Sequence, residues 1–230
     1  MDLRKVSSAA AALAIVMAAR RSAADGGGRL LVYLHAAVKQ RALQSALQDA
    51  LAGVTVTAVG RIGDLDRSLK EGQDAVLSLP MVFAANGLTA KLQGLRQGAP
   101  DETYSLVGVN APPDPAAVTA VGALDLLGRD GTNAFVSGML GSQPKVERVT
   151  KVEDLLPLLQ MEVVQAVLMA TRFFAEVKGT SQLNLAAREL PKRQPLPAVA
   201  SVGPAGDAVV AAVSKLGGGA LKVLGVDSWR

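Results

Sequence analysis

Few residues of this chain belong to the types that carry out covalent chemistry. The 230 residues include one histidine, His35, and no cysteine, so multi-histidine metal sites and thiolate nucleophiles are excluded. A Ser-His-Asp triad would have to use His35, yet the chain contains no G-x-S-x-G nucleophile motif. Neither the G-x-G-x-x-G dinucleotide fingerprint nor a P-loop occurs. The sequence therefore predicts a protein that is not an enzyme, with no catalytic residue, no metal and no cofactor.

Three places in the sequence could hold a small solute through hydrogen bonds. His35 and Ser78 stand at the carboxyl ends of predicted strands, which is where open α/β sheets bind ligands. Gly131, Thr132 and Asn133 stand where a helix is expected to begin, and helix-terminal amides beside hydroxyl and amide side chains suit an anion. Plainer interpretations stay open. His35 and Ser78 could be ordinary residues at strand ends, and Gly131–Asn133 could belong to a loop in which Asp130 caps the helix, so that its negative charge would oppose a bound anion.

The basic charge of the chain is concentrated at its N-terminus. The formal net charge is +4, but residues 1–24 hold four basic side chains and one acid, so the remainder carries about +1. With 3% aromatic residues and no basic cluster, a nucleic-acid partner is not expected. A basic start, an uncharged run of about 14 residues and the small residues 22–24 are typical of a secretory signal peptide.

A pair of arginines, Arg20 and Arg21, lies between the uncharged run and the expected cleavage point, which is an uncommon place for charge. A soluble Ala-rich helix is therefore the alternative. We expect residues 1–24 to be a signal peptide, cleaved or retained, and the protein to be periplasmic or otherwise exported.

Strand-like and helix-like segments alternate along the chain. Hydrophobic strands are expected at 30–34, 54–59 and 74–78, with helices at 38–51 and 64–69 between them. Three strands joined by two helical crossovers predict a parallel sheet.

A Pro-rich turn at 111–115 separates this unit from a second one, in which the same alternation restarts. A segment at 191–197 that is rich in Pro and in Lys and Arg is expected to cross back to the first unit. We therefore predict an α/β protein of two lobes with mainly parallel sheets flanked by helices. The predicted division is 25–110 and 196–230 for lobe 1, and 111–195 for lobe 2.

Several short motifs occur in a recognisable order. In the first, Lys70–Val76 (KEGQDAV), a predicted helix is followed by the pattern Gly-x-Asp-Ala and then by a strand. The others are Gly131–Asn133, which precedes a helix; Lys151–Leu168, which contains a helix and the strand after it; and the ending Leu224–Trp229 (LGVDSW). From about Arg29 to Trp229 this order resembles that of the type 2 periplasmic binding proteins, most of all the phosphate- and phosphonate-binding subunits of ABC transporters. The resemblance implies two lobes closing around a small anionic solute, with a membrane permease as partner.

The sequence departs from that family at its ligand-binding positions. Ser78, Leu79 and Pro80 stand where the family commonly has aromatic pocket residues, and Gln165 stands where it has an acid. The family's second-lobe histidine has no counterpart, since His35 lies in the first lobe.

Two functions remain open. In the first, the protein is a solute-binding subunit of an ABC-type uptake system, with Thr132 and Asn133 supplying donors from one lobe and Ser78 or His35 from the other. In the second, the fold has lost its solute site and acts as an interaction or accessory subunit of a cell-envelope complex. The missing aromatics and acid favour the second function, and the retained strand, loop and helix order favours the first. A hydrolase that uses His35 would lack a nucleophile motif.

Overall fold

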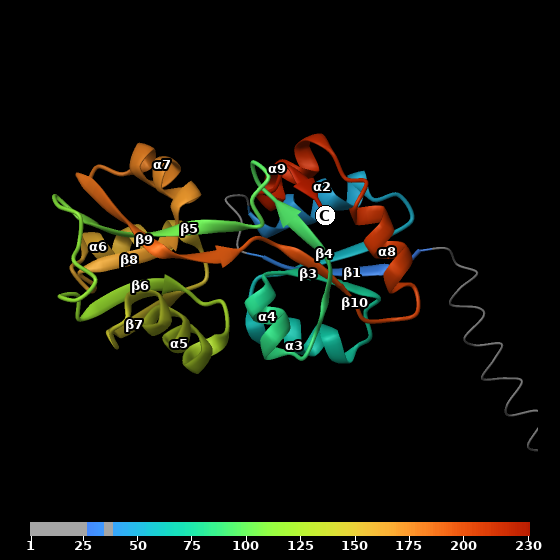
Figure 1. The fold of residues 1–230 in the computed structure, drawn as a ribbon, viewed down its shortest axis with the longest axis horizontal. Helices are drawn as coiled ribbons and strands as arrows, with labels where there is room; N and C mark the ends of the chain where they lie inside the picture. The colour runs from blue at the N-terminus through green and yellow to red at the C-terminus, as the bar shows by residue number, and fades with distance from the viewer. Residues whose placement is uncertain (1–26, 35–38) are drawn as a thin grey trace, which may run out of the picture.

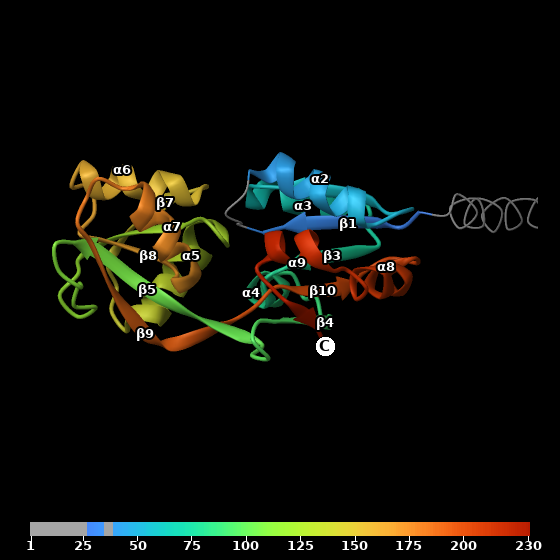
Figure 2. The same cartoon turned by 90° about the horizontal axis from the view of Figure 1, so that it is seen from above.

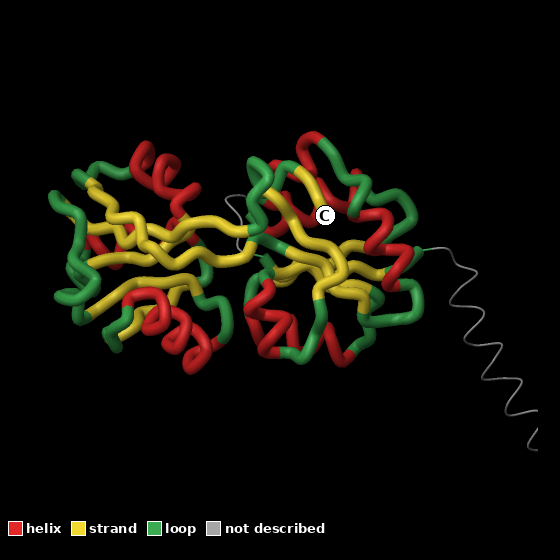
Figure 3. Tube along the Cα trace, viewed as in Figure 1, coloured by secondary structure: helices red, strands yellow, loops and turns green. Residues whose placement is uncertain are grey.

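Two β-sheets organise the part of the chain that the computed structural model describes, residues 27–34 and 39–230 (Figure 1). Each sheet forms the centre of one lobe, and helices pack around the strands in both lobes (Figure 3). The expected signal peptide and His35 lie outside the described residues.

The sheet of lobe 1 has six strands in the order β11-β4-β10-β3-β1-β2. These are β1 (Arg29–Tyr33), β2 (Thr55–Val59), β3 (Ala75–Ser78), β4 (Ala90–Leu95), β10 (Ala198–Ser201) and β11 (Ser228–Trp229). The central strand β1 is parallel to both neighbours, and its last four residues are buried. A strand covered on both faces reads as a continuous hydrophobic run, which is why the sequence predicted it.

Within the described part of the chain, five helices cover this sheet: α2 (Gln40–Ala50), α3 (Ile62–Lys70), α4 (Pro80–Ala85), α8 (Gly206–Val213) and α9 (Gly218–Leu224). Helices α2 and α9 lie on one side of the sheet, and α3 and α4 lie on the other (Figure 1). Leu43 and Leu47 of α2 are buried one turn apart, so the helix packs its apolar stripe against the sheet.

The sheet of lobe 2 has five strands in the order β7-β6-β8-β5-β9. These are β5 (Asp101–Val109), β6 (Ala120–Leu124), β7 (Lys145–Val149), β8 (Ala166–Ala170) and β9 (Leu185–Pro195). Its helical segments are α5 (Gly128–Leu140), η1 (Val152–Asp154), α6 (Leu155–Gln160) and α7 (Thr171–Thr180). Strands β7, β6 and β8 are parallel, whereas β5 pairs antiparallel with β8 and β9, and β10 antiparallel with β3 and β4. Both sheets are therefore mixed rather than mainly parallel.

The chain crosses between the lobes twice, from β4 to β5 and from β9 to β10 (Figure 2). The two crossings are bonded to each other, because the Leu196 N–H donates to the Pro100 carbonyl at 2.8 Å and the Gly94 N–H to the Pro197 carbonyl at 2.8 Å. The side-chain amide of Gln93 also donates to the Leu196 carbonyl, at 2.9 Å. These hydrogen bonds make the crossings a two-stranded hinge.

The division of the chain between the lobes differs from the prediction at one boundary. Residues 101–109 form β5 and pair within the second sheet, whereas we expected lobe 1 to extend to residue 110. The Pro-rich segment expected as a crossing is mostly strand, since β9 extends to Pro195. Because β9 is the edge strand of its sheet, its prolines do not remove hydrogen bonds from a central ladder.

Candidate solute site between the lobes

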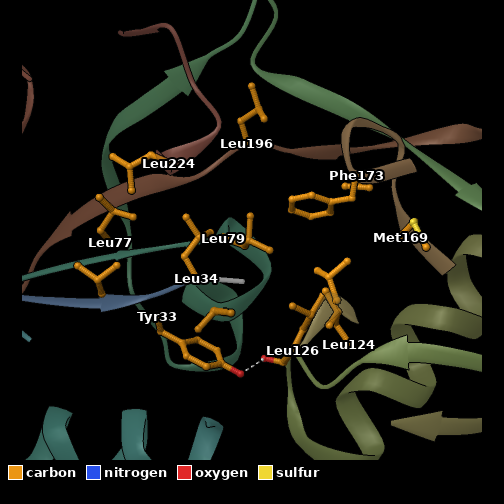
Figure 4. Close-up of a cluster of buried hydrophobic side chains, with 14 of the residues drawn as sticks. Tyr33, Leu34, Leu77, Leu79, Leu124, Leu126, Met169, Phe173, Leu196 and Leu224 are labelled. Carbon is orange, nitrogen blue, oxygen red and sulfur yellow. Dashed lines mark hydrogen bonds between the residues drawn. The ribbon is translucent and has the colours of Figure 1, made fainter. Parts of the chain in front are cut away.

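The carboxyl ends of β1 and β3 face those of β6 and β8 across the gap between the lobes (Figure 4). Tyr33, the last residue of β1, spans this gap. Its hydroxyl donates to the backbone carbonyls of Asp125 and Leu126 in lobe 2, at 3.0 and 3.2 Å. Burial raises the pKa of Tyr33 far above its ordinary value, and the negative charges of Asp125 and Asp66 raise it further. The hydroxyl therefore stays protonated and donates a direct hydrogen bond from one lobe to the other.

Apolar side chains surround the end of this hydrogen bond (Figure 4). Lobe 1 contributes Leu34 and Leu79, and lobe 2 contributes, among others, Leu124, Leu126 and Phe173. The cavity left among them, which we call the apolar pocket, has a volume of about 20 Å³. That volume is close to the space needed by one water molecule. The side chains thus fill the place where the four strand ends meet.

A buried ion pair borders the apolar pocket on the hinge side. Arg172, in the first turn of α7, pairs with Glu102 of β5, and both side chains are almost completely buried. The guanidinium also lies over the Phe173 ring, 4.5 Å from its centroid. Glu102 Oε2 is buried and has no hydrogen-bond partner. Because each charge compensates the burial of the other, loss of either partner would leave an uncompensated charge inside the protein.

A second, larger cavity opens between the lobes. It has a volume of about 400 Å³, and we call it the polar cavity. Its described lining residues are Leu34, Lys39, Gln40, Gly60, Arg61 and Asp64 from lobe 1, and Thr150, Lys151, Val152 and Glu153 from lobe 2. Ligand pockets in proteins commonly have volumes of about 300 to 1,000 Å³, so this cavity has the size of a small-molecule site.

Three helical segments begin at the wall of the polar cavity. A basic residue stands immediately before each of them: Lys39 before α2, Arg61 before α3 and Lys151 before η1. None of the three makes a side-chain capping hydrogen bond. The first amides of a helix have no partner within the helix, and its N-terminus carries a partial positive charge. Side chains and helix ends therefore both make the cavity attractive to an anion.

The acids of the polar cavity offset this positive charge only in part. Asp64 pairs with Arg67 of the same helix, Nη2 to Oδ1 at 3.3 Å. Glu153 is exposed and belongs to the first turn of η1, which favours an acid by itself. The anion-attracting groups therefore predominate.

His35 lies outside the described residues, and the other predicted site residues line neither the polar cavity nor the apolar pocket. Ser78 is completely buried, and its hydroxyl donates to the Tyr33 carbonyl at 2.6 Å. Thr132 is also completely buried; its hydroxyl donates to the Asp125 carboxylate and accepts the Leu127 N–H, both at 3.2 Å. Both hydroxyls are thus engaged in bonds within the protein that hold the strand ends in place.

Gly131 and Asn133 lie inside α5, which begins at Gly128, earlier than expected. A Cβ at Gly131 would come within 2.4 Å of Leu127 Cβ, so close packing requires a glycine there. Asn133 is exposed. Neither residue lines the polar cavity or the apolar pocket.

Sequence reasoning missed the three basic residues of the polar cavity. Lys39, Arg61 and Lys151 are single charges on ordinary helix starts, far apart in the chain. The signal that could have found them is the residue type, because Ser, Thr, Asp or Asn usually precedes a helix. A base there leaves the terminal amides uncapped.

The sheets, the crossings and the inter-lobe cavities together define the two-lobed α/β fold of the periplasmic binding proteins. The periplasmic VFT2 domain of Bordetella pertussis BvgS matches with a TM-score of 0.58 and 13% identity over 90% of this chain and 95% of that chain. A mutant of arginine-bound ArgBP from T. maritima matches with a TM-score of 0.56 and 14% identity, over 86% and 94%. The substrate-binding protein of an amino acid ABC transporter matches with a TM-score of 0.55 and 11% identity, over 86% and 92%.

At these identities the similarity shows the fold alone; two of the three proteins are described as arginine-bound and as a substrate-binding protein. No protein-family model matches the chain, and no curated protein matches it. Among the described residues, no helix is long and apolar enough to cross a membrane. The same part of the chain contains no group of three or more His, Cys, Asp or Glu side chains that could hold a metal.

Proposed function

We propose that this protein is a solute-binding protein that holds a small organic anion between its lobes. The observation that carries the proposal is the polar cavity, where Lys39 and Arg61 of lobe 1 meet Lys151 of lobe 2. An anion bound there would interact with positive charge on both lobes at once. Binding would therefore stabilise arrangements in which both lobes contact the solute.

Carboxylate is the anionic group that we favour. Two proteins that share the fold are described as arginine-bound and as part of an amino acid transporter, and amino acids carry a carboxylate. A cavity of about 400 Å³ also leaves room for more than an inorganic ion. A phosphate or phosphonate group is the other chemistry that this lining accepts. In this proposal the protein is exported and delivers its solute to a membrane permease.

A calorimetric and thermal-shift panel tests the proposal. It compares mono- and dicarboxylates, acidic and neutral amino acids, phosphate, phosphonates and sulfate. A true ligand at about 100 times its Kd should stabilise the fold by roughly 2.7 kcal/mol. Binding that weakens as salt concentration rises would support an electrostatic site.

Matched charge variants locate the site. Arg61→Gln and Lys151→Gln each remove one positive charge from the polar cavity, and we expect each to weaken binding at least severalfold. Arg129→Gln removes one charge from an exposed position on α5, and Asn133→Ala changes a predicted site residue outside the cavity. Both should leave Kd unchanged. Equal effects of Arg61→Gln and Arg129→Gln, or no binding by any anion, would refute the proposal.

A further inference from the structure

Leu34 belongs to both cavities between the lobes. It lines the polar cavity on one side and the apolar pocket on the other. The residue is 8% exposed, so its side chain forms a wall between the two spaces. A solute bound in the polar cavity would therefore lie directly against the apolar side chains behind Leu34.

The apolar pocket, with a volume of about 20 Å³, has room for about one water molecule in this arrangement and would enlarge if the lobes moved apart. Leu34 and Leu79 belong to lobe 1, whereas the facing Leu126 and Phe173 belong to lobe 2. Hinge motion at the two crossings would separate these two sets of side chains. The space that opens between them would be poor in polar partners, and an apolar group would fill it more favourably than water.

We propose that the solute is amphipathic, with its anionic group in the polar cavity and an apolar tail that passes Leu34 into the apolar pocket. This inference rests on the proposed function and names the substrate class of that site. The substrate class is a monocarboxylate with an aliphatic or aromatic tail. The position of Leu34 and the side chains beyond it carry the inference.

The far end of the pocket sets a further limit on the tail. Glu102 lines it, and its Oε2 atom is buried without a hydrogen-bond partner. A second carboxylate at the end of the tail would exchange water for a mostly apolar lining, in which Arg172 is already paired with Glu102, and would lose most of its hydration. A dicarboxylate of the same length should therefore bind much more weakly than the monocarboxylate.

A homologous series tests the inference on the unmodified protein. Calorimetry with propionate, butyrate, hexanoate and octanoate should show Kd falling about fourfold for each added methylene until the pocket is full. The heat-capacity change of binding should become more negative along the series, because more apolar surface is buried. Suberate, the dicarboxylate with the chain length of octanoate, should lose most of the gain.

Variants of Leu79 separate the tail from the anionic group. Leu79→Asn places a polar amide in the apolar pocket, and we expect it to abolish the chain-length dependence of Kd. Leu79→Met keeps an apolar side chain of similar size and should retain the dependence. Both variants are compared with the parent by their unfolding transitions.

The two proposals fail in different ways. A Kd that is the same from propionate to octanoate, together with binding that is weakened by Arg61→Gln, would overturn the amphipathic solute and leave the anion site standing. Absence of binding by every anion would overturn both. A steep series that Arg61→Gln weakens uniformly, and Leu79→Asn flattens, supports both.

Discussion

Removal of the Tyr33 hydroxyl would test whether a direct hydrogen bond holds the lobes together. In the Tyr33→Phe variant the carbonyls of Asp125 and Leu126 lose the donor that lies 3.0 and 3.2 Å away. One O–H shared between two acceptors counts as one bond, and a buried hydrogen bond contributes about 1 kcal/mol net. The ring itself remains, so the packing of the aromatic side chain is kept.

A loss of about 1 kcal/mol corresponds to roughly a fivefold change in the ratio of closed to open protein. The chain has no cysteine, so the double substitution Ala42→Cys and Gln160→Cys would place spin labels at two exposed positions, one on each lobe. Pulsed electron paramagnetic resonance then measures the distance between the lobes. We expect the Tyr33→Phe variant to show a larger population at long distance.

Tyr104→Phe is the matched control. It removes the same atom from a buried tyrosine of β5 that also lines the apolar pocket but, among the described hydrogen bonds, makes none to lobe 1, so the distance between the lobes should not change. An unchanged distance distribution in Tyr33→Phe, with a free energy of unfolding within about 0.3 kcal/mol of the parent, would refute the proposed role of the hydroxyl.

The pKa of Tyr33 adds an alkaline test of the same bond. Burial raises the pKa in the folded state, whereas the unfolded chain ionises near the ordinary value of about 10. The unfolded state therefore releases its proton first, and stability falls as pH rises above about 10. Tyr33→Phe removes this contribution. Tyr104 has a raised pKa for the same main reason, so part of the alkaline loss should persist.

Three further predictions concern residues of lobe 2. Arg172→Met leaves the Glu102 carboxylate buried without its counter-ion, and urea unfolding should show that the free energy of unfolding falls by about 3 to 5 kcal/mol. The double variant Glu102→Leu/Arg172→Met should restore most of this stability. Losses that simply add in the double variant would contradict the interpretation. Thr132→Val removes two hydrogen bonds at the start of α5 and should cost about 1 to 2 kcal/mol in the same assay, while Kd for the solute stays unchanged. The Lys145 ammonium, with Nζ 2.7 Å from the carboxylate of Glu147, lowers the pKa of that carboxyl group. The small stabilisation from this ion pair should therefore be present at neutral pH and be lost as pH falls through the lowered pKa. In the Glu147→Gln variant, the free energy of unfolding should depend less on pH at the acid end, and a pH dependence identical to that of the parent would be evidence against the pair.

The sequence alone was sufficient for the elements whose pattern is local. Strand β1 reads as a buried hydrophobic run, and α2 carries Leu43 and Leu47 at helical spacing; both elements form where they were expected. The alternation of such segments, together with the order of short motifs, predicted the two-lobed α/β fold. Burial on both faces of a strand, or along one stripe of a helix, selects residue types that are visible in the sequence.

The tertiary structure decided how the chain is divided and which side chains meet. Strand β9 has two prolines and four charged residues, yet it forms because β5 pairs with it along one edge. Ser78 and Thr132 have the residue types of a solute site, but the partners that engage their hydroxyls are set by neighbouring strands and loops. Lys39, Arg61 and Lys151 meet only because two lobes bring three helix starts to one cavity. A local pattern reports which face of an element is buried, whereas a site depends on contacts between residues distant in sequence, and only the folded chain specifies them.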